Sequence, residues 1–214
     1  MSDTSSTLLT TLLNSELIRW LVTEVVQFWK ERQFQGTYKV LDHDVTLELK
    51  DRLGHTAIYT KRQQVEFQQN GVFAIQDQAW GDGDIFANYR CSPGVLVDKH
   101  IESYRWKLLI SLRTTKNRGD QEEFLIERTI KNGFTTETEH FETQIDHQTK
   151  QLRLSVIFPR TRLPHMVSVM EQNSKRSFPL GKDNMEALSE GRVAYHWTVA
   201  KPRLFEAYVI RWEW

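Results

Sequence analysis

Two spacings of hydrophobic residues divide the chain into an N-terminal segment and a longer remainder. Between residues 6 and 33, apolar side chains recur every three or four positions without Pro or Gly, which predicts one long amphipathic helix. After Gly36 the spacing changes to two, as in strands whose alternate side chains face opposite sides of a sheet. We therefore expect a helix within residues 1–35 and a β-domain over residues 36–214.

Short polar turns, rather than helices, separate the alternating segments of the β-domain. Asn70-Gly71 is the strongest turn signal, and the stretch 77–94 is expected to be loop-like, with room for a short strand between its two turns. Three hairpins are expected, joining 45–49 to 56–68, 137–146 to 151–158, and 192–200 to 204–214. The pattern predicts an all-β antiparallel β-sandwich of about nine to eleven strands with one long N-terminal α-helix. A closed barrel is the alternative, but the corner at Pro159 and Pro164 favours a strand that changes sheets.

The last alternating segment places Tyr208, Ile210, Trp212 and Trp214 on one face of a strand. Exposure of so much apolar surface to water is unfavourable, and a frayed terminus rarely carries two tryptophans. We therefore expect the C-terminal segment to be an inner strand of the β-domain.

The composition narrows the classes of function. Lys plus Arg and Asp plus Glu number 28 each among 214 residues, so the formal net charge is zero. A dedicated nucleic-acid binder needs basic residues to neutralise phosphates, which makes nucleic acid an unexpected partner. The one cysteine, Cys91, excludes an intrachain disulfide, and no apolar stretch is long enough for a membrane helix. Both features favour a cytoplasmic protein without membrane contact.

The predicted helix is apolar around most of its girth, which indicates contacts on more than one side. One stripe can pack on the sheet, and the other would remain for a protein partner or for a second copy of the chain. The long loop at 77–94 is an alternative cover for that stripe. The residues expected to bind the partner are Leu13, Leu17, Ile18, Leu21, Val22, Val25, Val26 and Trp29.

Two groups of residues are candidates for chemistry. Asp77, Asp82 and Asp84 could supply oxygen ligands to Ca²⁺, but Gly-Asp-Gly-Asp is also typical of a tight turn, so we expect no metal. Cys91 could act as a nucleophile, although no hydrolase motif surrounds it. The histidines lack zinc-ligand spacing, and neither a phosphate-binding loop nor a nucleophile elbow occurs. We therefore expect no cofactor and assign no catalytic residue.

Neutral charge, the wide apolar arc and the missing catalytic motifs favour a non-catalytic protein-interaction or assembly module of an intracellular, bacterial system. A barrel-like carrier of a small apolar ligand is the second hypothesis, and a pocket between the sheets would favour it. A hydrolase that uses Cys91 or the acidic loop is the third. A histidine within hydrogen-bond reach of Cys91 would favour that enzyme.

Overall fold

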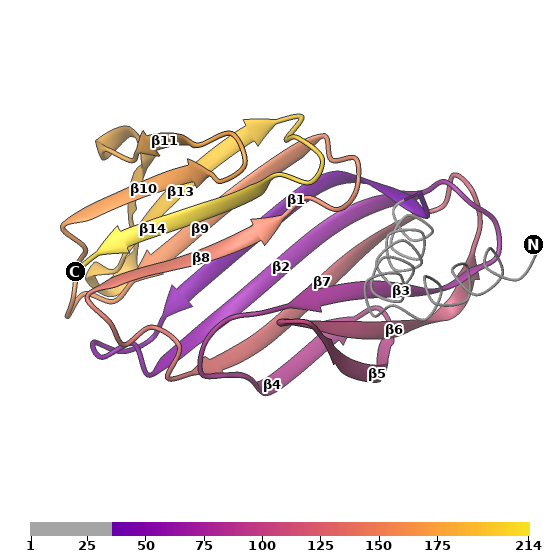
Figure 1. Ribbon diagram of the computed structural model, residues 1–214, viewed down its shortest axis with the longest axis horizontal. Coiled ribbons are helices and arrows are strands. Elements are labelled where there is room, and N and C mark those ends of the chain that lie inside the picture. The colour runs from indigo at the N-terminus through magenta and orange to yellow at the C-terminus, as the bar shows by residue number, and fades with distance from the viewer. Residues whose placement is uncertain (1–35) are drawn as a thin grey trace, which may run out of the picture. The chain divides into compact units, whose positions relative to one another are not determined.

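The computed structural model describes residues 36–214, which form fourteen strands in three sheets (Figure 1). The chain divides into two units, Met1–Thr37 and Tyr38–Trp214. The predicted N-terminal helix lies outside the described residues. Within the described part, the helical elements are two three-residue 3-10 helices, η1 (Lys182–Asn184) and η2 (Ser189–Gly191), so it contains no long helix.

The largest sheet has seven strands and is mixed. Its order is β12 (Met185–Ala187), β13 (Val193–Ala200), β9 (Gln151–Phe158), β1 (Tyr38–Leu49), β2 (Thr56–Phe67), β7 (Gln121–Lys131) and β4 (Asp84–Ser92). β1 and β9 run parallel, whereas the other neighbouring strands of this sheet are antiparallel. Parallel pairing is typical of well-buried strands, and β9 has three consecutive buried residues, Leu154, Ser155 and Val156.

Two smaller sheets cover one face of the seven-stranded sheet. One has the order β11 (Arg176–Pro179), β10 (Met166–Glu171), β14 (Ala207–Glu213) and β8 (Thr138–Gln144), and the other has β3 (Val72–Ala79), β6 (Arg105–Lys116) and β5 (Val95–Glu102). Under the four-stranded sheet, the ring centres of Trp212 and Phe158 lie 5.6 Å apart. Under the three-stranded sheet, Ile110 of β6 belongs to the same buried cluster as Val65 of β2. The covered face is therefore the inner face, and the opposite one is the outer face.

The predicted antiparallel sandwich of nine to eleven strands with a long helix is wrong. The described chain has fourteen strands in three sheets, and the largest sheet is mixed. Alternation identifies which side chains share a face, but it carries no information about which strand lies beside which. The parallel pair β1–β9 joins segments that are far apart in the sequence, where no turn signal can indicate the pairing.

One of the three predicted hairpins is confirmed. β1 and β2 pair antiparallel across the turn at Asp51. The other two are wrong, because β8 pairs with β14 and β13 pairs with β9, so each predicted partner lies in a different sheet. The connections after β8 and β13 therefore carry the chain from one sheet to another. The stretch 77–94, expected to be loop-like with room for a short strand, contains the edge strand β4, which extends over nine residues.

Two predictions about the C-terminal half are confirmed. β14 lies between β10 and β8, and Trp212 is completely buried, so the last strand is an inner strand. The corner at Pro159 and Pro164 joins β9 of the seven-stranded sheet to β10 of the four-stranded sheet. Proline at such a corner leaves both ladders intact, because it lies outside the paired segments.

Candidate functional site

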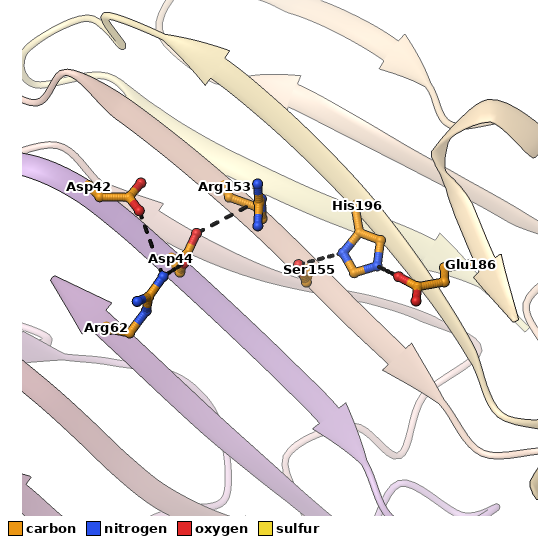
Figure 2. Close-up of polar contacts among 7 residues, drawn as sticks. All are labelled: Asp42, Asp44, Arg62, Arg153, Ser155, Glu186 and His196. Atoms are coloured by element: carbon orange, nitrogen blue, oxygen red, sulfur yellow. Dashed lines mark hydrogen bonds and ion pairs between the residues drawn. The ribbon is translucent and has the colours of Figure 1, made fainter. Parts of the chain in front are cut away.

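A row of alternating charges crosses the outer face of the seven-stranded sheet. Asp44 of β1 pairs in register with Arg62 of β2 on one side and with Arg153 of β9 on the other. Paired residues of neighbouring strands point to the same face, so the three charges lie side by side. Arg62 Nη2 lies 2.5 Å from Asp44 Oδ2, and Arg153 Nε lies 4.0 Å from Asp44 Oδ1. Dashed lines mark both contacts in Figure 2.

Two further carboxylates flank Arg62. Its Nη2 lies 3.7 Å from Asp42 Oδ2, and its Nη1 lies 3.2 Å from Glu123 Oε2 of β7. We call this set the charged row; its members are Asp42, Asp44, Arg62, Glu123 and Arg153. The hydrogen bond from Arg62 to Asp44 is the largest effect that raises the pKa of the guanidinium, so its charge is permanent.

The charged row is open to solvent. The side chains of Arg62 and Arg153 are 46% and 51% exposed. Ion pairs at such positions contribute about 0–1 kcal/mol to stability, because water screens them and ordering long side chains costs entropy. The row therefore adds little to folding, and its charges remain available to another molecule.

A second line of polar contacts lies beside the charged row. Ser155 of β9 pairs in register with His196 of β13, and Ser155 Oγ lies 2.8 Å from His196 Nδ1. On the other side of the ring, His196 Nε2 lies 3.1 Å from Glu186 Oε2 of β12 (Figure 2). Serine, histidine and carboxylate are also the groups of a hydrolase nucleophile and its base.

Exposure argues against a catalytic role for this line. Ser155 is 3% exposed, whereas the Glu186 side chain is 62% exposed. A nucleophile must meet its substrate, but here the hydroxyl is the enclosed end of the line and the carboxylate is the open end. The contact with His196 therefore satisfies the hydrogen bonding of a buried hydroxyl.

A shallow hollow lies beside this line at the β12 edge of the sheet. Its volume is about 630 Å³, and its lining residues are Asp183, Asn184, Met185, Glu186, His196, Trp197 and Thr198. The lining is mainly polar, and it lies at an exposed sheet edge rather than between the sheets. The hollow therefore lacks the apolar enclosure that a carrier of an apolar ligand needs.

The structure separates the three aspartates that the sequence suggested for Ca²⁺. Asp77 is buried and forms an ion pair with Lys61, whereas Asp84 Oδ1 accepts a hydrogen bond from the Phe86 amide. The Gly-Asp-Gly-Asp segment is a tight turn against the end of β7, where a Cβ at Gly83 would lie 2.2 Å from the Lys131 carbonyl oxygen. Among residues 36–214, no group of three or more His, Cys, Asp or Glu side chains is placed to hold a metal ion.

Cys91 lies on β4 and is half-buried. Burial is the largest effect on its thiol and raises the pKa, and the charge of Asp77 raises it further. The sulfur is therefore protonated at neutral pH, whereas a nucleophilic cysteine needs a thiolate.

The residues expected to bind a partner through the N-terminal helix, Leu13 to Trp29, lie outside the described residues. The charged row and the Ser155–His196–Glu186 line were not identified from the sequence as a site. Their outward positions follow from the alternation of each strand, and Arg153 falls in a basic region of the sequence. The missing information was the register, which alone places Asp44 between two arginines.

Comparisons with known proteins give little further information. The sequence matches no protein-family model, and no curated protein matches it. The structure is similar to that of Legionella pneumophila aminopeptidase A, solved in complex with aspartic acid, with 16% identity and a TM-score of 0.44. The similarity covers 81% of this chain and 21% of that chain, so this chain spans about a fifth of that protein. Among the described residues, no helix has the length and apolar character to cross a membrane.

Proposed function

We propose that the protein is a non-catalytic self-association module, and that the outer face of its seven-stranded sheet is the surface that joins two copies. The charged row is the observation that carries the proposal. It alternates half-exposed arginines with carboxylates on one face, where each arginine can pair with a carboxylate of a second copy. Arginine is enriched at protein interfaces, because its planar fork pairs well with carboxylates.

A second copy fits this face better than a partner of one charge. A two-fold contact needs a self-complementary surface, and the charged row contains both signs. The chain has a formal net charge of zero, so two copies do not repel each other at long range. Seven strands spaced about 4.8 Å apart offer a face on the order of 1,000 Å², comparable with about 800 Å² per partner in specific interfaces.

Small side chains beside the charged row allow close approach. Thr46 of β1 pairs in register with Thr60 of β2 and with Ser155 of β9. The centre of the outer face is therefore flat and rich in hydroxyl groups, and the longer arginine side chains lie beside it. A flat surface with charges of both signs suits the stacking of two sheets.

Charge reversal in matched pairs of variants tests this function. The variant R62E/R153E has a wholly acidic row, and the variant D42R/D44R/E123R has a wholly basic one. Each variant alone should sediment as a monomer, because like charges then face each other. An equimolar mixture should form dimers again, because acidic and basic rows are complementary.

The matched control is R113E/R118E, which makes the same change of charge on exposed arginines of β6 and of the turn that follows it. This control should associate like the wild-type chain. If the charge-reversed variants of the row dimerise alone, or if their mixture stays monomeric, the outer face is not the contact between the two copies. Circular dichroism confirms that each variant keeps its β-structure.

A cytoplasmic location is part of this proposal. With a single cysteine, the chain does not depend on an oxidising compartment for its stability. When two copies of the β-domain associate, they also bring together their two N-terminal segments. They could bring together two copies of a bound partner protein in the same way.

A further inference from the structure

A different row of residues lies on the inner face of the seven-stranded sheet. Arg128 of β7 pairs in register with Tyr59 of β2 on one side and with Tyr89 of β4 on the other. Arg128 Cζ lies 4.1 Å from the centre of the Tyr59 ring, so the guanidinium packs against that ring. Tyr59 therefore holds one part of the guanidinium, and Tyr89 lies on its other side.

Several polar atoms of this row lack partners. Arg128 is 7% exposed, and its Nε and Nη1 atoms have no hydrogen-bond acceptor among the described residues. The hydroxyl of Tyr89 is also buried and unpaired within this part of the chain. Unpaired buried donors are rare and costly in folded proteins, so these atoms require an acceptor that residues 36–214 do not supply.

The charges nearby leave one positive charge in excess. The carboxylate of Asp77 is paired with Lys61, and burial lowers the pKa of Lys61 less than Asp77 and Tyr59 raise it, so Lys61 is cationic. His43 faces the same interior, but burial, and then Lys61 and His147, lower its pKa to about 3, so it is neutral. Among the described residues, the group therefore contains two cations and one carboxylate. A buried charge without a counter-charge is unfavourable.

Half-buried aromatic side chains of β4 and β6 adjoin this row. Tyr89 and Phe86 of β4 are half-buried, with ring centres 6.0 Å apart, and Phe86 lies 5.6 Å from Trp106 of β6. The exposed Lys99 of β5 places Nζ 4.5 Å from the Phe86 ring centre and 5.0 Å from that of Trp106. An anion approaching from this side meets a cation first and an apolar wall next.

We propose that Arg128 and Tyr89 form a binding site for a small carboxylate, which reaches them past Phe86 and Trp106. One negative charge matches the single excess positive charge. Carboxylate oxygens can accept hydrogen bonds from the guanidinium and from the Tyr89 hydroxyl, and such charge-assisted bonds are the strongest that these groups form. The flanking rings suit a ligand whose carboxylate is attached to a small apolar body.

Thermal unfolding of the full chain in sodium acetate and in sodium benzoate, at constant ionic strength with sodium chloride, tests the site. A ligand that binds only the folded state raises the melting temperature by about 3–6 °C at ten times its dissociation constant, for a chain of this size. We expect a saturable rise in at least one of these carboxylates. No rise in either would mean that buried water satisfies Arg128, and would overturn the proposal.

Two variants locate the effect. Y89F removes one hydroxyl and keeps the ring, so it should fold and bind the carboxylate about tenfold more weakly. R128Q should abolish the response. The matched control is R162Q, since Arg162 also lies over an aromatic ring, with Cζ 4.2 Å from the centre of Trp214, but at a different place in the fold. R162Q should respond like the wild-type chain.

Other anions distinguish a carboxylate site from a general one. Sodium phosphate in place of acetate should give a smaller rise, because it brings up to two charges and a tetrahedral shape. An equal rise in phosphate, or an unchanged affinity in Y89F, would contradict the assignment. If R128Q does not fold, the comparison of Y89F with the wild-type chain still decides the outcome.

Discussion

Lys61 and Arg62 are consecutive residues of β2, and each forms an ion pair on a different face of the same sheet. Lys61 points inward to Asp77 of β3, and these side chains are 13% and 6% exposed. Arg62 points outward to Asp44 of β1, and these side chains are 46% and 19% exposed. Both pairs join a basic side chain to an aspartate, but the inward pair is shielded from water and the outward pair is partly exposed to it.

This difference assigns separate tasks to the two faces. Inside, each ion has lost its hydration and depends on the other, so the pair must remain intact. Outside, water screens the charges, and the pair can be exchanged for a pair with another molecule at little cost. The inner face therefore determines stability, and the outer face is free to bind.

The largest change in the free energy of unfolding is expected in the aromatic interior under the four-stranded sheet. Trp212 is completely buried, with ring centres 5.7 Å from Phe134 and 5.6 Å from Phe158. Trp212→Ala should lower the free energy of unfolding by about 3–5 kcal/mol, the usual cost of removing a large buried aromatic side chain. Chemical denaturation measures the change. A loss below about 1 kcal/mol would show that β14 contributes little to the core.

The inward ion pair should be nearly as sensitive. Lys61→Met leaves the buried carboxylate of Asp77 without its partner, and should cost about 3 kcal/mol. The double variant K61M/D77L removes both charges and should recover most of that loss, because well-packed apolar residues can replace a buried pair. A double variant as unstable as the two single changes together would mean that the pair is not coupled.

His43 gives the inner face a pH dependence. Its pKa is about 3 in the folded chain and 6.5 when unfolded, chiefly because burial disfavours the charged ring. The stability linked to His43 is therefore complete above pH 6.5 and is lost as the pH falls toward 3. Between pH 6.5 and 5 the loss should be about 2 kcal/mol. His43→Gln should flatten the stability curve in this window.

The outward pair should have the smallest effect on folding. Arg62→Ala should change the free energy of unfolding by less than about 1 kcal/mol, although the side chain contacts three carboxylates. Thermal denaturation at low and at high salt measures the change. A larger loss would mean that the charged row stabilises the domain, and the contrast between the two faces would disappear.

The sequence predicts which side chains of a strand share a face, but for most strands it does not predict which strand lies beside which. Alternation identifies the faces of β1, β2 and β14, including the inward position of Trp212, because side-chain direction is a local property. Pairing is not local: β9 lies parallel to β1, and β13 lies beside β9 rather than beside β14. The site depends on that register. Asp44 becomes part of a row only when two distant strands flank it, and no spacing in the sequence indicates this.

The hydrophobic pattern also did not identify the charged side chains of the inner face. Lys61 and Arg128 occupy positions where alternation predicts apolar residues, and the sequence shows only a break in the pattern there. Their partners lie on other strands, so the sequence cannot distinguish a satisfied buried charge from an exposed one. Such exceptions are expected at strained or functional positions.

Sedimentation equilibrium of the wild-type chain, at low salt and at 1 M salt, tests the central claim most directly. The outer face is proposed to join two copies through exposed charges, so at low salt the mass should approach twice the 25.3 kDa of one chain. At 1 M salt, where screening acts within about 3 Å, the dimer should weaken markedly. A single species of 25.3 kDa at every protein concentration and at both salt levels would contradict the account.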